Sequence, residues 1–232
     1  MTSSVATRDV LVVSGPDAES FLQGQLSQDL AAIPAGESAW SFLLQPQGKV
    51  DALVRLTHLD GDRWQIDVDA GWGDAVKTRL ERFKLRVKAA IEHGDAGAAA
   101  PLFADERARI EAGWPLMGAE LTDKTIPAET GLVDRTVSFT KGCFTGQELV
   151  ARIDSRGGNV PRHLRTIRLE GPGAPTGAAV VVGDKVVGTL TSVAGDIGLA
   201  YVARDVVPPS DATVRWEGGE TPARIETVPL ES

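Results

Sequence analysis

The chain has 232 residues with a formal net charge of −8, and 42% of its residues are hydrophobic and 24% charged. This composition is typical of a globular protein, so it excludes intrinsic disorder and collagen-like repeats. The acidic balance disfavours a protein-wide affinity for nucleic acid. The one cysteine, Cys143, excludes an internal disulfide and a metal site made of several cysteines. No signal-peptide pattern and no membrane-length apolar run is found, so we expect a soluble, cytoplasmic protein without membrane contact.

The first hundred residues predict strands combined with helices. A β-branched run at 10–13 indicates a strand, and Asp17 is expected to cap a helix that carries Phe21 and Leu22. After Trp72, apolar residues at helical spacing predict a second helix. Further strands are expected at 39–44, 50–59, 64–68 and 85–91. Together these elements indicate a small α+β sandwich.

The rest of the chain predicts a middle segment followed by a β-rich end. Residues 106–112 are expected to form a helix or a strand, and the glycine-rich turn at 157–161 marks a boundary. A hairpin is expected around Gly183 and Asp184, because Gly-Asp suits a two-residue turn between apolar runs. Strands at 199–202 and 213–216 complete a compact barrel or sandwich.

The segment Lys141–Glu148, K-G-C-F-T-G-Q-E, is the most informative for chemistry. Thr145 and Glu148 have the T-x-x-E spacing of a capping box, which would place Cys143 just before a helix N-terminus. The helix dipole and the charge of Lys141 would then favour the reactive thiolate. The alternative is that Cys143 is a small buried hydrophobic residue and that Glu148 only caps its own helix.

The same octapeptide resembles the K-G-C-[FY]-x-G-Q-E signature of the YgfZ proteins, folate-binding relatives of the glycine-cleavage T-protein (aminomethyltransferase). The segment 15–30 with its F-L-Q-G-Q and the R-I-E-A-G-W-P at 109–115 extend the resemblance. It implies an α+β fold in a ring-like GcvT/YgfZ-type arrangement, with a ferredoxin-like α/β sandwich and a C-terminal β-barrel. The expected domains are a discontinuous N-terminal domain at 1–47 and 105–158, an inserted sandwich at 48–104 and a barrel at 159–232.

The resemblance also implies site residues. Asp51 in Q-G-K-V-D-A matches the T-protein aspartate that faces the reacting end of the folate, although Ala52 replaces the second acid of that motif. Arg109 matches an arginine near the folate, and Glu129 stands where a pocket acid is expected. Asp51 and Cys143 are the expected catalytic residues, and the ligand is tetrahydrofolate or a derivative. The signature residues are Lys141, Gly142, Cys143, Gly146, Gln147, Glu148 and Arg152.

For function, the resemblance implies a folate-binding accessory protein that supports iron–sulfur enzyme assembly or repair and tRNA modification, with iron–sulfur proteins as partners. One alternative is a folate-dependent aminomethyltransferase of the T-protein class. Another is a cysteine-nucleophile enzyme that uses His163. The length of 232 residues, Ala52 and Cys143 favour the accessory protein, so whether it is an enzyme is left open.

A basic stretch with five arginines between Arg152 and Arg168 stands out in this acidic chain. It fits a folate polyglutamate tail, an RNA phosphate or a solvated strand face. Aromatic residues are not interleaved with it, so direct nucleic-acid binding is not expected.

Overall fold

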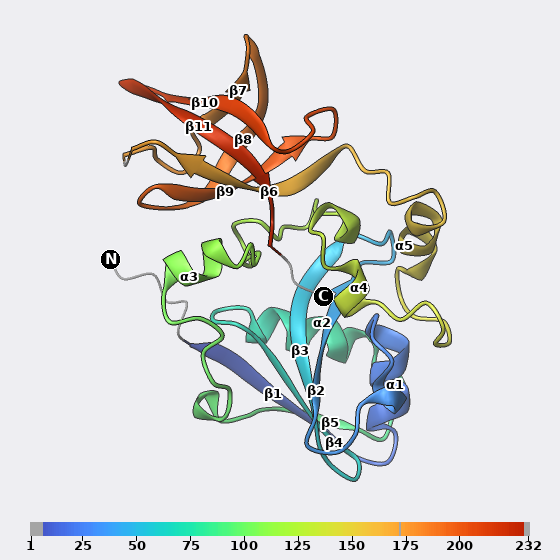
Figure 1. Cartoon of the computed structure of the whole chain (residues 1–232). Helices are drawn as coiled ribbons and strands as arrows, with labels where there is room; N and C mark the ends of the chain where they lie inside the picture. The colour runs from blue at the N-terminus through green and yellow to red at the C-terminus, as the bar shows by residue number, and fades with distance from the viewer. Residues whose placement is uncertain (1–6, 172, 230–232) are drawn as a thin grey trace.

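The computed structural model of the chain describes residues 7–171 and 173–229. A five-stranded antiparallel sheet forms one part and a six-stranded closed β-barrel forms the other, so the fold is mixed α+β as predicted. Figure 1 shows the barrel above the sheet, with the segment that carries α3, α4 and α5 between and beside them.

The sheet has the strand order β2-β3-β4-β1-β5, and neighbouring strands pair antiparallel. Without the edge strand β2, the order of elements along the chain is the β-α-β-β-α-β of a ferredoxin-like sandwich, which confirms that prediction. The apolar sides of both helices join the core beneath the sheet, with Leu22 and Leu80 packed in the same cluster as Leu11. The elements are β1 (Arg8–Ser14), α1 (Ala18–Gln25), β2 (Ser38–Leu44), β3 (Val50–Asp60), β4 (Arg63–Asp69), α2 (Gly73–Phe83) and β5 (Ala90–His93).

The sheet crosses the domain boundary expected at residue 47. β1 and β2 come from the segment 1–47, whereas β3, β4 and β5 come from 48–104. β1 pairs with β4 from Arg8↔Asp69 to Ser14↔Arg63, and β2 pairs with β3, so the sandwich is not confined to an inserted unit. The limits at 104 and 158 stay predictions.

The strand expected at 85–91 is much shorter than predicted. Only Ala90–His93 forms β5, and it pairs with the stretch of β1 from Leu11 to Ser14. Arg86 has a left-handed backbone with φ of 59°, which does not fit an extended strand. The apolar run is therefore a turn followed by a short edge strand.

The barrel closes in the order β10-β11-β6-β9-β8-β7. Its interior is apolar, with Ile167, Val180, Val202, Val214 and Ile225 in one buried cluster. The predicted hairpin is confirmed as β7 and β8 around Gly183, whereas β6 was anticipated only as the strand-face alternative for the basic stretch. The strands are β6 (Arg162–Leu169), β7 (Ala179–Val182), β8 (Lys185–Ala194), β9 (Ile197–Ala203), β10 (Ser210–Trp216) and β11 (Gly219–Thr227).

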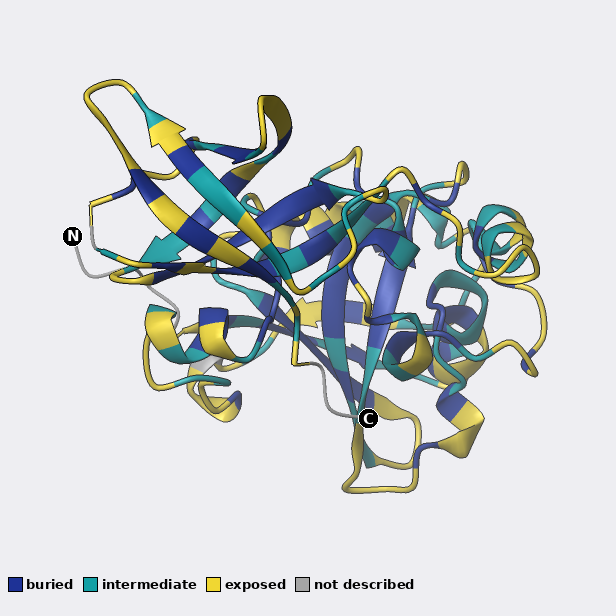
Figure 2. Ribbon diagram, turned by 45° about the horizontal axis from the view of Figure 1, so that its top comes forward, coloured by how far each residue is buried: buried dark blue, intermediate teal, exposed yellow. Residues whose placement is uncertain are grey.

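The middle segment joins the two parts. It carries α3 (Glu106–Glu111), α4 (Val133–Thr136) and α5 (Gln147–Asp154). Ile110 of α3 packs against Leu199 and Tyr201 on the outer face of the barrel. Figure 2 shows the buried residues concentrated in the strands and the exposed ones in hairpin ends and loops. In the described part of the chain, no helix is both long and apolar enough to span a membrane.

Candidate functional site

Asp51 lies in β3 and forms an ion pair with Arg79 of α2. The Nε of Arg79 donates to Oδ2 of Asp51 over 2.9 Å. The same guanidinium donates to the backbone carbonyl of Leu44 over 2.9 Å and to Oε1 of Gln25 over 3.3 Å. Burial lowers the pKa of Arg79, and the hydrogen bond with Asp51 acts against that shift. Among the described residues, Oδ1 of Asp51 has no hydrogen-bond partner, so one carboxylate oxygen is available to a ligand.

A cavity of about 340 Å³ opens beside this pair, and we call it the Asp51 cavity. Its volume falls in the range of small-molecule sites. Its charged lining consists of Asp51, Arg79 and Asp123, and its other walls are mostly apolar. Asp51, Trp72, Val76, Arg79, Met117 and Asp123 are among the lining residues.

The turn between β2 and β3 lies directly against the start of α5. Gly146 has a φ of 82°, and a Cβ there would lie 2.6 Å from the carbonyl oxygen of Gln45. Gly48 has a φ of 80°, and a Cβ there would lie 2.9 Å from the carbonyl oxygen of Gly146. Both positions combine a left-handed backbone with a contact too close for a side chain, which explains why each is glycine.

Lys141 fastens the signature segment to the end of α1. Its buried Nζ donates to the backbone carbonyls of Gln23, Leu26 and Gln28 over 2.7, 2.8 and 2.7 Å. An ammonium group has three donors, so these carbonyls use all of them. Burial lowers the pKa of Lys141 to about 8, so the amine is charged at neutral pH. These bonds give Lys141 a structural role at the end of α1, and the expectation that its charge also acts on Cys143 stays a prediction.

Cys143 is exposed and free, so the alternative of a buried hydrophobic cysteine is wrong. The expected capping box is wrong as well. The helix begins at Gln147 with Gly146 as its N-cap, and no side chain caps it. Thr145 instead binds α1: its backbone N–H donates to the carbonyl of Gly24 over 3.0 Å. Because Gly146 needs a left-handed conformation against the β2–β3 turn, the helix cannot start at Thr145.

Three segments of the resemblance thus meet at the end of α1. Arg79, which holds Asp51, reaches Gln25, and Thr145 of the signature segment reaches the neighbouring Gly24. Cys143 does not line the Asp51 cavity. The arginine that binds Asp51 and the segment that carries Cys143 nevertheless contact adjacent residues of α1, Gln25 and Gly24. Glu148 and Arg152 are exposed on α5, and Gly142 is exposed beside the cysteine.

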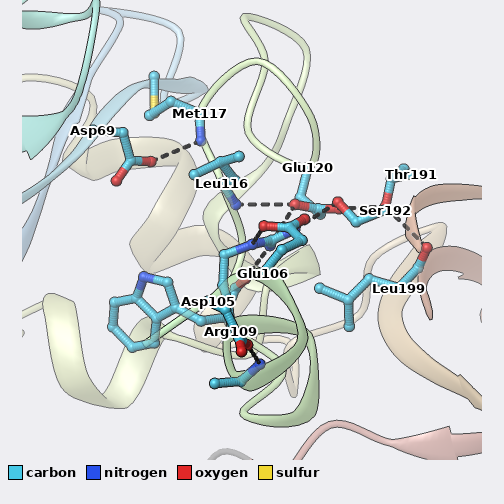
Figure 3. Close-up of polar contacts among 12 residues, drawn as sticks. Asp69, Asp105, Glu106, Arg109, Leu116, Met117, Glu120, Thr191, Ser192 and Leu199 are labelled. Carbon is cyan, nitrogen blue, oxygen red and sulfur yellow. Dashed lines mark hydrogen bonds and ion pairs between the residues drawn. The ribbon is translucent and has the colours of Figure 1, made fainter. Parts of the chain in front are cut away.

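Arg109 lies elsewhere, in a buried network between α3 and the barrel (Figure 3). Its five N–H groups are all used. Nε donates to Glu106 over 3.0 Å, and Nη2 donates to Glu106 over 2.5 Å and to the hydroxyl of Ser192 over 2.7 Å. Nη1 donates to the carbonyl of Trp114 over 2.5 Å and to Glu120 over 3.1 Å. In this conformation Arg109 has no donor left for a folate, and it joins the middle segment to β8.

Glu129 is also buried and paired. Its carboxylate accepts from Nε and Nη2 of Arg162 over 3.0 and 3.2 Å, and from the backbone N–H of Ile126 over 3.1 Å. It does not line the Asp51 cavity. Glu129 therefore connects the middle segment to β6 of the barrel.

The basic stretch does not form one continuous charged face. Arg162 is paired with Glu129, and Arg168 with Glu226 over 3.2 Å. Burial lowers the pKa of Arg165. His163 lies in β6, burial lowers its pKa, and within the described residues no contact joins it to Cys143. The Cys–His pair of the third hypothesis is therefore absent from this conformation.

Sequence reasoning missed Arg79, Trp72 and Glu120. Arg79 lies on α2 between the core residues Val76 and Leu80, so its helical spacing gives no sign of a partner in β3. Glu120 accepts from Thr191 and Ser192, both over 2.6 Å, across a gap of more than seventy residues. Within the described residues, no group of three or more His, Cys, Asp or Glu could hold a metal ion.

Comparison with known proteins places these features in a family. A model of the CAF17 C-terminal beta-barrel domain matches residues 162–230, a stretch that includes the barrel strands β6 to β11. An aminomethyltransferase of Rubrobacter xylanophilus is 30% identical over 229 residues, covering 95% of this chain and 56% of that protein. The human mitochondrial iron-sulfur cluster assembly factor IBA57 is 27% identical, covering 84% of this chain and 75% of that protein. The tRNA-modifying protein YgfZ of Klebsiella pneumoniae is 27% identical, covering 63% of this chain and 65% of that protein.

The chain belongs to the GcvT/YgfZ/IBA57 family. Its fold is GcvT-like: the crystal structure of the glycine cleavage system aminomethyltransferase T from Bartonella henselae matches with a TM-score of 0.83. That match covers 97% of this chain and 84% of the other at 18% identity, so it shows the fold alone. The chain spans little more than half the length of the Rubrobacter aminomethyltransferase.

Proposed function

We propose that this protein is a folate-binding accessory factor that supports the assembly or repair of iron–sulfur enzymes, including those that modify tRNA. One observation carries the proposal: the Asp51 cavity and the segment with the exposed Cys143 are anchored to adjacent residues, Gln25 and Gly24, at the end of α1. The relatives whose names refer to iron–sulfur cluster assembly and to tRNA modification support the same function. The cytoplasmic location expected from the sequence is part of this proposal.

The residues around the Asp51 cavity fit the pterin end of a folate. A pterin ring is flat and carries several N–H groups, so it needs apolar walls and an acceptor. Trp72 and Met117 supply such walls, and Oδ1 of Asp51 supplies the acceptor. Arg79 binds the other oxygen of Asp51, which holds the carboxylate in one orientation. When bound, a reduced folate supplies a carrier for one-carbon units.

Cys143 would act on a partner rather than on a cluster held by this chain alone. One cysteine cannot ligate an iron–sulfur cluster by itself, because such clusters need about four protein ligands. The thiol is exposed, and the loop that carries it is held at Lys141 and Thr145 on either side. A thiol in that position is accessible to another protein that contributes the remaining ligands.

A titration with tetrahydrofolate tests the proposed ligand. Trp72 lies in the cavity wall, so its fluorescence reports on occupancy. We expect saturable quenching in the wild type and binding weakened about tenfold or more in Asp51→Asn, since a hydrogen bond to a charged group is lost. Asp60→Asn is the matched control, because Asp60 is an exposed acid in β3 outside the cavity. Absence of saturable binding at millimolar tetrahydrofolate would refute the folate proposal.

An aminomethyltransferase activity is the second candidate. The 30% identity to the Rubrobacter aminomethyltransferase over 95% of this chain favours it. The chain covers only 56% of that protein, which counts against a complete enzyme. The two candidates are separated by turnover: folate-dependent release of ammonia, or formation of methylenetetrahydrofolate from an aminomethyl donor, supports the transferase.

A further inference from the structure

A second cavity, of about 510 Å³, lies between β2, α4, the segments on either side of α3 and the residue stretch after β11. We call it the tryptophan cavity. None of its lining residues lines the Asp51 cavity, so the two are separate spaces. Its lining includes Trp40, Leu102, Phe103, Trp114, Arg135 and Pro229.

Three aromatic rings form its walls. The ring centroids of Trp40 and Trp114 are 4.6 Å apart at an interplanar angle of 56°, and those of Phe103 and Trp114 are 6.3 Å apart at 49°. Trp114 is buried and therefore fixed, whereas Trp40 and Phe103 are half-buried and face the open space. Aromatic walls at these angles offer a large apolar surface to a flat ring.

Arg135 is the one charged residue in this lining. Nearby arginines are neutralised: Arg55 is paired with Asp67, and Arg109 with Glu106 and Glu120. By contrast, no carboxylate lies within ion-pair distance of Arg135 among the residues that the structure describes. Its guanidinium fork is therefore free to bind a carboxylate or a phosphate.

The aromatic walls and Arg135 together indicate the charge of the ligand. Aromatic walls alone also suit an organic cation, which binds over the ring faces. A positive charge in the same lining repels a cation and attracts an anion. The volume is that of a ligand of nucleotide size.

We propose that the tryptophan cavity binds a planar aromatic ring that carries a carboxylate or a phosphate. The ring packs against the accessible parts of Trp40 and Phe103, and the anionic group pairs with Arg135. Two sources share this chemistry, a nucleoside monophosphate and the p-aminobenzoylglutamate half of a folate. The proposal does not depend on the Asp51 cavity, since no lining residue is shared.

The test is a titration of the full chain carrying Asp51→Asn, which reduces binding in the Asp51 cavity. AMP and p-aminobenzoylglutamate are added separately, and binding is followed by calorimetry. We expect saturation by at least one of them with a Kd below about 1 mM, and uncharged adenosine or p-aminobenzamide to bind about tenfold or more weakly. Preference for one anion identifies the source.

Arg135→Gln should weaken binding of the preferred anion about tenfold or more, because a charged hydrogen bond is lost. Arg156→Gln is the matched control, since Arg156 is an exposed arginine outside this cavity. Phe103→Ala in the loop before α3 gives a second variant that spares the helices, and it should weaken all of the ring ligands together. Saturation of neither anion, or equal binding by Arg135→Gln and the parent, would overturn the proposal.

Discussion

Replacing Lys141 by methionine removes the ammonium group that closes the end of α1. The three backbone carbonyls that it binds then lose a hydrogen-bond donor. The bond to Leu26 is buried, whereas the bonds to Gln23 and Gln28 are partly buried. A buried polar group left without a partner costs about 1–3 kcal/mol. Water can reach the two partly accessible carbonyls, and the cost of burying the charge disappears. We therefore expect Lys141→Met to lower the free energy of unfolding by about 1–3 kcal/mol, most of it from the carbonyl of Leu26.

Urea unfolding followed by tryptophan fluorescence measures this loss. The midpoint should fall while the slope with denaturant stays unchanged, which indicates a change in stability rather than in the unfolded state. Lys124→Met is the matched control, because Lys124 is exposed and its amine has no ion-pair partner in the described part of the chain. It should change the unfolding free energy by less than about 0.5 kcal/mol. A loss of similar size in both variants would refute the role assigned to the three carbonyls.

Three further predictions follow from contacts at other positions. Gly146→Ala should destabilise by about 2–3 kcal/mol, whereas Gly142→Ala should be nearly neutral, because only Gly146 has a positive φ and a crowded Cβ position; equal melting temperatures would contradict this. Arg109→Met should cost about 3–5 kcal/mol by leaving buried Glu120 unpaired, and Glu120→Gln in the same chain should recover part of the loss; thermal unfolding of the single and double variants measures both. The pKa of Lys141 falls from 10.5 to about 8 on folding, so between these pH values the unfolded chain binds more protons and the wild type gains stability over Lys141→Met as pH rises. Urea midpoints of both proteins, measured below and above that pH interval, test the direction of this change. A stability difference between wild type and Lys141→Met that shrinks as pH rises would contradict the prediction.

Local patterns in the sequence predicted the elements with strong spacing signals. The helix after Trp72 forms as α2, with Val76 and Leu80 buried, because its apolar residues repeat at helical spacing. The hairpin at Gly183 forms because the turn chemistry and the flanking apolar runs agree. The capping box at Thr145 failed because a distant contact, the β2–β3 turn against Gly146, fixes where α5 begins.

The candidate site was only partly predictable for the same reason. The sequence singled out Asp51 and Cys143, but Arg79 is separated from Asp51 by 28 residues and no local pattern joins them. Arg109 and Glu129 were expected near the ligand, yet their carboxylate and guanidinium partners, Glu120 and Arg162, hold them at the junction with the barrel. Ion pairs between residues that are distant in sequence depend on the strand order and on how the barrel packs against the sheet. The spacing of residues in the sequence predicts neither.

The proposal as a whole is tested most directly in cells that lack the native gene. Such cells are supplied with the wild type, Cys143→Ser or Asp51→Asn, and the activity of an iron–sulfur enzyme is measured at equal levels of folded protein. Both variants change single groups that are at least partly exposed, so we expect them to fold like the wild type. We predict that the wild type restores the enzyme activity and that neither variant does so fully. Full restoration by either variant would contradict this prediction.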